Sequence, residues 1–135
     1  QDCAYLIDSL LILNILCTII ETEKQKRDNW SEIGFLQRCN HPNIVKFYDA
    51  YDMGSEMWIV TEFLEGGTLS EAANRHQFSE QHIGYIAREM LKALTYLHNN
   101  KMVHRDLKSA NVMMSIDAEI KLIDFGLCCE LVNGE

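Results

Sequence analysis

The sequence is poor in several residue types and patterns, and each shortage excludes a class of protein. Pro42 is its single proline, and none of its five cysteines forms the Cys-x-x-Cys pair of a zinc ribbon. An odd number of cysteines, two of them adjacent, also argues against a disulfide framework and indicates reduced thiols in a cytosolic or nuclear protein, of which we expect the cytoplasmic location. Lys and Arg number 12 against 20 Asp and Glu, and the net charge of −8 argues against nucleic acid as a partner.

Long apolar runs are also missing. Residues 9–20 carry no charged side chain, but a membrane-spanning helix needs about 20 apolar residues and a secretory signal needs a basic start. The run therefore argues against a membrane as a partner, and we expect one or two buried strands or an apolar helix there. A membrane or signal segment and sequence foreign to the fold are the alternatives. Because 47% of the residues are hydrophobic, the chain can bury a core.

What the sequence does contain is a dense group of polar side chains at residues 104–111, His-Arg-Asp-Leu-Lys-Ser-Ala-Asn. Asp106, Lys108 and Asn111 lie so close in sequence that one short loop can direct all three at a single point. Transfer of a phosphoryl group needs a carboxylate to orient the attacking hydroxyl, a cation near the phosphate and oxygen ligands for a metal ion. These residue types meet that need.

A second segment brings a further carboxylate, Asp124, at the start of an Asp-Phe-Gly sequence. The sequence predicts a short strand at residues 112–114 and another at residues 119–123. The turn between these strands is predicted at residues 115–118. A hairpin returns the chain to its starting point, so we expect Asp124 to lie beside Asn111.

Residues 104–111 resemble the catalytic loop of eukaryotic protein kinases, His-Arg-Asp-Leu-x-x-x-Asn, and residues 124–126 resemble their metal-binding motif. Lys108 is the residue that the serine/threonine-specific members carry two positions after the catalytic aspartate. Together with residues 57–67, the loop looks most like the sterile-kinase group, which includes germinal-centre and p21-activated kinases. The resemblance implies a signalling enzyme that transfers the γ-phosphoryl group of ATP, with Mg²⁺, to Ser or Thr hydroxyls of protein substrates.

The resemblance also implies a role for each matching residue of the loop and hairpin. Asp106 would orient and deprotonate the hydroxyl, and Lys108 would offset charge on the phosphate. Asn111 and Asp124 would hold Mg²⁺, and Met113 would pack under the adenine ring.

Residues 61–67, Thr-Glu-Phe-Leu-Glu-Gly-Gly, resemble the hinge of a kinase. On that resemblance Thr61 guards the back of the adenine pocket, and backbone groups of Glu62 and Leu64 hydrogen-bond adenine. Glu32 matches the glutamate of the regulatory helix.

The expected fold is α+β, a truncated form of the bilobal protein-kinase fold. We expect residues 1–29 to match the family poorly and residues 30–135 to be a partial kinase domain. Within it, residues 30–62 would be part of the N-lobe with the regulatory helix, residues 63–67 the hinge, and residues 68–135 the first part of the helical C-lobe.

Helical spacing locates the helices of this domain. A short amphipathic helix should start near Trp30 and end before Pro42. A capping box at Thr68 predicts a helix that ends near His76, and Ser79 should cap the next helix. The apolar face of that last helix should be core; its members are Ile83, Ile86 or Ala87, Met90, Leu94 and Leu97.

Two family features are absent, and they favour a second hypothesis. No lysine precedes Lys24, and Lys24 and Lys26 lie so close to Glu32 that we expect them on a connecting loop rather than on the preceding strand. The glycine-rich phosphate loop is missing as well. The polypeptide alone should therefore be a weak or inactive kinase, and the alternative is a non-catalytic, kinase-like binding module. In relatives an arginine at the position of Arg105 pairs with a phosphorylated loop, which implies an upstream activating kinase.

Overall fold

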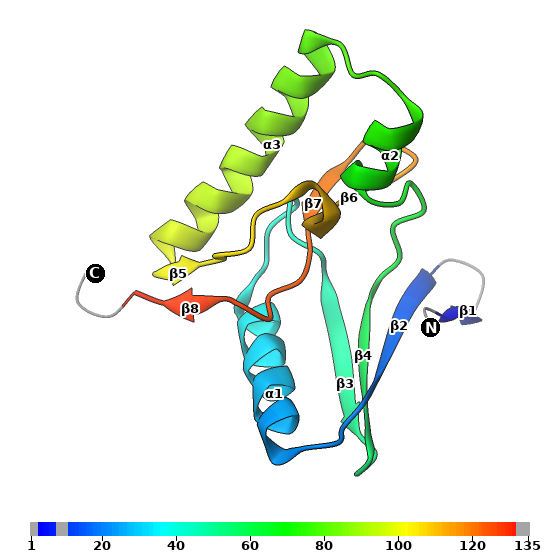
Figure 1. Ribbon diagram of the computed structural model, residues 1–135, viewed down its shortest axis with the longest axis vertical. Coiled ribbons are helices and arrows are strands. Elements are labelled where there is room, and N and C mark those ends of the chain that lie inside the picture. The colour runs from blue at the N-terminus through cyan, green and yellow to red at the C-terminus, as the bar shows by residue number, and fades with distance from the viewer. Residues whose placement is uncertain (1–2, 8–10, 132–135) are drawn as a thin grey trace. The chain divides into compact units, whose positions relative to one another are not determined.

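The computed structural model describes residues 3–7 and 11–131. Its chain forms two compact units, which are described separately (Figure 1). The first unit comprises Gln1–Asn40 and Lys46–Phe63, and the second comprises His41–Val45 and Leu64–Glu135. Both units combine helix and short strands, as the α+β class requires.

The first unit is built on a four-stranded antiparallel sheet of order β1-β2-β4-β3 (Figure 1). Its strands are β1 (Cys3–Ile7), β2 (Leu11–Ile19), β3 (Phe47–Asp52) and β4 (Glu56–Glu62). The apolar run at residues 9–20 therefore contributes the strand β2, one of the two structures expected for it. Burial is only partial, because Leu16 and Ile19 are exposed. Among the described residues, no helix has the length and apolar character needed to cross a membrane.

The helix α1 (Glu23–Arg38) begins earlier than expected. The expectation of a helix starting near Trp30 was wrong, and so was the placement of Lys24 and Lys26 on a loop. The reason is a capping box, in which Gln25 N donates to Thr22 Oγ1 at 3.2 Å and Thr22 N donates to Gln25 Oε1 at 2.9 Å. The polar residues that follow are good helix formers, so the helix can start seven residues before its first apolar side chain.

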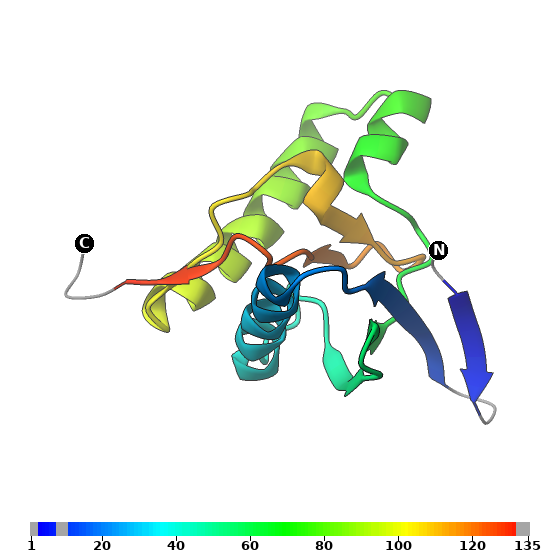
Figure 2. The same cartoon turned by 60° about the horizontal axis from the view of Figure 1, so that its bottom comes forward.

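One face of the sheet packs against α1, as Figure 2 shows. The core of this unit joins Ile33 of α1 to Met57 and Ile59 of β4. Successive side chains of a strand point to opposite faces, so Trp58 and Val60 lie on the face turned away from α1.

The second unit contains two further helices, α2 (Leu69–Arg75) and α3 (Glu80–Asn99). Both begin where the sequence predicts: Thr68 Oγ1 accepts from Glu71 N at 3.1 Å, and Ser79 Oγ accepts from His82 N at 3.3 Å. The 3₁₀ turn Ser109–Asn111 leads into β6 (Val112–Met114), which pairs with β7 (Ile120–Leu122), and β5 (Met102–Val103) pairs with β8 (Cys129–Glu130).

The predicted core face of α3 is only partly correct. Met90 and Leu97 are buried, but Ile83 is 55% exposed. The strands that contact α3 are β5 and β7, and these are two and three residues long, so they leave Ile83 uncovered.

Candidate active site

The catalytic-loop segment places two polar side chains around one carboxylate. Asp106 Oδ2 accepts a hydrogen bond from Lys108 Nζ at 2.7 Å and another from Asn111 Nδ2 at 2.8 Å. Asn111 Nδ2 also donates to the backbone oxygen of Asp106 at 3.0 Å. One short loop therefore brings the three residues to a single point, as the spacing predicts.

The electrostatics of this cluster keep Asp106 ionised. The hydrogen bond from Lys108 lowers the pKa of the Asp106 carboxyl; partial burial opposes this shift, and the Asn111 amide adds to it. Reciprocally, Asp106 raises the pKa of Lys108. The result is a charged carboxylate next to a charged ammonium: the carboxylate is unprotonated and can accept a hydrogen bond from a hydroxyl, and the ammonium can lie beside an anionic substrate.

His104 is a buried residue that contacts the backbone of Asp106. It is 1% exposed, and its ring lies edge-on to Phe125 with the centroids 5.1 Å apart. Asp106 N donates to His104 Nδ1 at 3.3 Å, and the other ring nitrogen, Nε2, lies 3.1 Å from Ile123 O. One ring thus fixes the backbone of both motifs. Sequence reasoning assigned no role to this histidine, although its position within the motif was a signal.

The hairpin returns the chain to the loop. Val112 pairs with Leu122, and Ile123 N donates to Asn111 O at 3.0 Å, so Asp124 follows directly after a contact with Asn111. Asp124 has a backbone φ of 61°, an unusual conformation for a residue with a side chain, and its Oδ1 accepts from Gly126 N at 3.2 Å.

Arg105 shares this left-handed conformation, with a φ of 64°. Its Nε donates to the backbone oxygen of Leu127 at 2.7 Å, which ties the catalytic loop to the segment after Asp-Phe-Gly. Residues held in such sparsely populated conformations cluster at functional sites.

Asn111 and Asp124 fit a divalent metal ion of the hard, oxygen-seeking kind. Asn111 uses Nδ2 for both of its contacts with Asp106, so its side-chain oxygen takes no part in them. The carboxylate of Asp124 is exposed to solvent. Mg²⁺ is commonly bound by one or two protein side chains together with substrate phosphates and water, and this donor set meets that requirement.

The residues expected to bind adenine are distributed over both units. Thr61 and Glu62 end β4 in the first unit, where Glu62 N donates to Lys46 O at 3.0 Å. Leu64 is buried in the second unit, and Met113 is half-buried there in β6. Two hydrogen bonds tie the hinge-like segment to the strand of Met113: Gly66 N donates to Met114 O at 2.9 Å, and Met114 N donates to Gly67 O at 3.0 Å.

Glu32 lies in α1, directly before the buried Ile33. It is half-buried and belongs to the first unit, whereas the Asp106 cluster belongs to the second.

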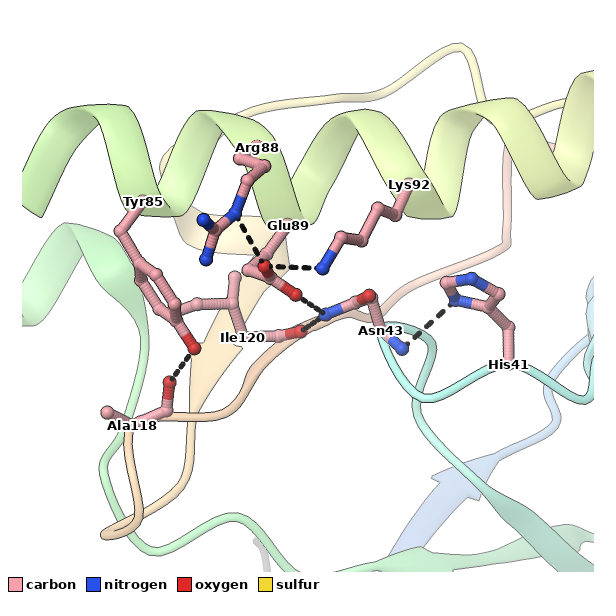
Figure 3. Close-up of polar contacts among 8 residues, drawn as sticks. All are labelled: His41, Asn43, Tyr85, Arg88, Glu89, Lys92, Ala118 and Ile120. Carbon is pink, nitrogen blue, oxygen red and sulfur yellow. Dashed lines mark hydrogen bonds and ion pairs between the residues drawn. The ribbon is translucent and has the colours of Figure 1, made fainter.

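A second polar cluster anchors loop 41–45 in the second unit (Figure 3). Asn43 Nδ2 donates to Glu89 Oε2 at 3.1 Å and to Ile120 O at 2.9 Å. Glu89 Oε1 accepts from Lys92 at 2.7 Å and from Arg88 at 3.1 Å, and the Lys92 bond in particular lowers the pKa of Glu89 to about 2. Because Ile120 begins β7, this cluster positions the strand that leads to Asp124. Sequence reasoning missed it, although a glutamate beside Met90 on an apolar helix face was a visible signal.

Comparison with known proteins agrees with this geometry. The protein kinase domain family matches residues 15–135, a span that begins within β2. "Probable serine/threonine-protein kinase mkcB" of Dictyostelium discoideum is 55% identical over 114 residues, which cover 84% of this chain and 16% of that protein. "Serine/threonine-protein kinase pak-2" of Caenorhabditis elegans is 34% identical over 130 residues, which cover 96% of this chain and 25% of that protein.

A third relative, "Serine/threonine-protein kinase CST20" of Candida albicans, is 37% identical over 112 residues, 83% of this chain and 9% of that protein. The chain therefore spans only a small part of the curated relatives that it matches. The family match covers most of the chain, and it includes the loop, the hairpin and the Asp-Phe-Gly segment. The chain belongs to the protein kinase family.

Proposed function

We propose that this chain is part of a serine/threonine protein kinase and carries that enzyme's phosphoryl-transfer loop. The observation that carries the proposal is the Asp106 carboxylate, held at 2.7 Å by Lys108 and at 2.8 Å by Asn111. This arrangement orients a general base and places a cation beside it, which are two of the protein groups that transfer to a hydroxyl needs. The names of its relatives support Ser and Thr as the acceptors.

Each residue of the cluster then has a defined task. Asp106 accepts a hydrogen bond from the substrate hydroxyl and takes its proton late in the transfer. Lys108 exchanges part of its contact with Asp106 for the transferred phosphate. Asn111 and Asp124 supply side-chain oxygens to Mg²⁺, which when bound neutralises the charge of the ATP phosphates.

The hinge-like residues and Met113 are the ones that we propose to contact the adenine ring of ATP. Thr61 borders the adenine pocket, the backbone of Glu62 and Leu64 hydrogen-bonds the ring, and Met113 packs against it. Glu32 orients the cation that contacts the other phosphates in a complete domain.

A non-catalytic binding module is the second candidate, and one observation favours it. The strand β2 precedes α1 and pairs with β4, but residues Leu11–Ile19 include no lysine. Met57 and Ile59 of β4 pack against Ile33 of α1, and the β2 residues paired with them point to the same side of the sheet. The β2 positions on the side of α1 are therefore Asn14, Leu16 and Thr18. No cation on this strand supports the phosphates, and loss of such a contact commonly lowers the rate by about 10²–10³.

The test is incorporation of labelled phosphate into a generic protein substrate by the 135-residue chain. We expect a rate about 10²–10³ below the order of 1 per second that is typical of kinases. Asp106→Asn should abolish it, because the neutral amide cannot accept the proton. The matched control is Asp117→Asn, at an exposed position of the β6–β7 turn, which should leave the rate unchanged. A rate that survives Asp106→Asn would contradict the proposal, and no incorporation by the unaltered chain would favour the binding module.

A further inference from the structure

The sheet face turned away from α1 carries an aromatic hollow of about 570 Å³. Pairing between strands brings its residues together, since Val60 stands opposite both Ile15 and Asp49, and Trp58 stands opposite Tyr51. The residues that form its walls are Ile15, Tyr48, Asp49, Tyr51, Met53, Trp58 and Val60. All of them belong to the first unit, so the hollow is independent of the Asp106 cluster.

The aromatic side chains of this hollow are unusually exposed. Tyr51 is 50% exposed, Trp58 38% and Tyr48 36%. A soluble domain rarely leaves adjoining aromatic side chains in water unless they contact a partner. Tyrosine and tryptophan are also the residues that most often dominate the energy of protein interfaces.

The polar groups around the rings favour a positively charged partner. Tyr51 donates its hydroxyl proton to Asp49 Oδ2 at 2.8 Å, and Trp58 Nε1 donates to Glu56 Oε2 at 3.1 Å. The donors of Tyr51 and Trp58 are therefore already used within the protein. Of the two carboxylates that accept from them, Asp49 lines the hollow and Glu56 lies beside Trp58. Lys46 Nζ lies 5.1 Å from the centre of the Tyr48 ring, so one ring of this surface already has a cation over its face, and the rings of Tyr51 and Trp58 can take a second one.

We propose that this hollow binds a proline-rich peptide segment that carries an arginine or lysine. Proline rings pack flat against exposed aromatic faces, and a polyproline helix is already ordered before it binds, so little entropy is lost. The basic side chain would lie across Tyr51 or Trp58 and reach the carboxylates of Asp49 and Glu56. A phosphorylated peptide or a nucleic acid would be repelled, because its negative phosphate groups would lie next to the negative carboxylates of Asp49 and Glu56.

The experiment measures binding of a fluorescein-labelled peptide, Arg-Pro-Leu-Pro-Pro-Leu-Pro, to the 135-residue chain by fluorescence anisotropy. Tyr51→Ala removes one exposed ring and should weaken binding about 30-fold, the loss expected for an interface hot spot. Asp49→Asn should weaken it about threefold and reduce its sensitivity to salt, because it removes one charge from the rim. Tyr51→Phe retains the ring and should bind like the unaltered chain.

The matched control is Trp30→Ala, which removes an exposed tryptophan from α1, outside the hollow. Since Tyr51 is half exposed, its variants should retain the melting temperature of the unaltered chain, and this is measured alongside. A peptide in which glutamate replaces the arginine should not bind. Absence of saturable binding, binding that survives Tyr51→Ala, or equal binding of the glutamate peptide would each overturn the proposal. None of these outcomes bears on phosphoryl transfer, which is tested at Asp106 in the other unit.

Discussion

At the scale of single residues, the proposed chemistry depends on how Asp106 is held. Lys108 and Asn111 both donate to Oδ2, and His104 fixes the backbone from the buried side. The carboxylate thus keeps one oxygen in a fixed network, while the loop around it reaches solvent. A general base needs this combination of orientation and access.

This environment predicts the titration of Asp106. The pKa of its carboxyl should lie below the ordinary aspartate value, and Lys108→Ala should raise it, because the Lys108 bond is the largest cause of the shift. Asn111→Ala should raise it less. The measurement is a ¹³C NMR titration of the Asp106 carboxyl carbon, with Lys24→Ala in the other unit as control. An Asp106 pKa that does not respond to Lys108→Ala would show that the pair is absent in solution.

Asn43 is a second residue with a defined energetic role. It is 5% exposed, and its amide nitrogen satisfies both Glu89 and the backbone oxygen of Ile120. Asn43→Ala leaves these buried acceptors short of a donor, which should lower the free energy of unfolding by about 1–3 kcal/mol. Urea unfolding measures the change, and Asn74→Ala on the exposed side of α2 should change stability by about 0.5 kcal/mol or less. Equal effects of the two substitutions would contradict the anchoring role.

At the scale of elements, the sequence predicted those boundaries that local chemistry determines. Thr68 and Ser79 start helices because their hydroxyl oxygens accept hydrogen bonds from backbone N–H groups of the first turn, which have no partner within the helix. The turn at residues 115–118 joins β6 to β7 as expected, with Ala118 N donating to Ser115 O at 3.2 Å. Such signals lie within a few residues of one another, so they can be read without knowledge of the fold.

Features that depend on distant partners could not be read in this way. The polar first half of α1 gives no apolar pattern, and Lys26 in it pairs at 2.7 Å with Asp52 of β3. The exposure of Ile83 depends on how far β5 and β7 extend along α3. The Glu89 cluster joins residues that lie 46 positions apart in sequence. The proximity of Asp106, Lys108 and Asn111 was predictable because they occur together in one motif, but their mutual contacts were not.

The hairpin that delivers Asp124 contains a strained turn, and this predicts a stabilising substitution. Ala118 has a φ of 62°, which costs energy for any residue with a side chain. Ala118→Gly should stabilise the unit by roughly 0.5–1 kcal/mol, because the relief of strain exceeds the added freedom of the unfolded chain. Ala73→Gly within α2 provides the matched control and should destabilise by roughly 0.5–1 kcal/mol. Thermal unfolding of both variants gives the two signs, and a loss of stability in both would refute the assignment of strain.

At the scale of the whole molecule, the two units carry different parts of the proposed chemistry. The second unit holds the base, its lysine and the oxygen ligands, all within residues 104–124. The first unit holds Glu32 but supplies no lysine from β2. We therefore expect this chain, which has an ordered base but no lysine on β2, to retain binding of metal and substrate while its rate of phosphoryl transfer is low.

Restoring that cation is the most direct test of the whole arrangement. Leu16 stands opposite Ile59, which packs with Ile33 of α1, so a lysine at this position would lie on the side of Glu32. Leu16→Lys should therefore raise phosphate incorporation by about 10²-fold, the size of effect expected of one such contact. Cys17→Lys is the matched control, because the next residue of the strand points to the opposite face and should give no gain. Combination with Asp106→Asn must abolish any gain. If Leu16→Lys and Cys17→Lys have the same activity, the missing lysine is not what limits this chain, and the binding-module hypothesis becomes the stronger one.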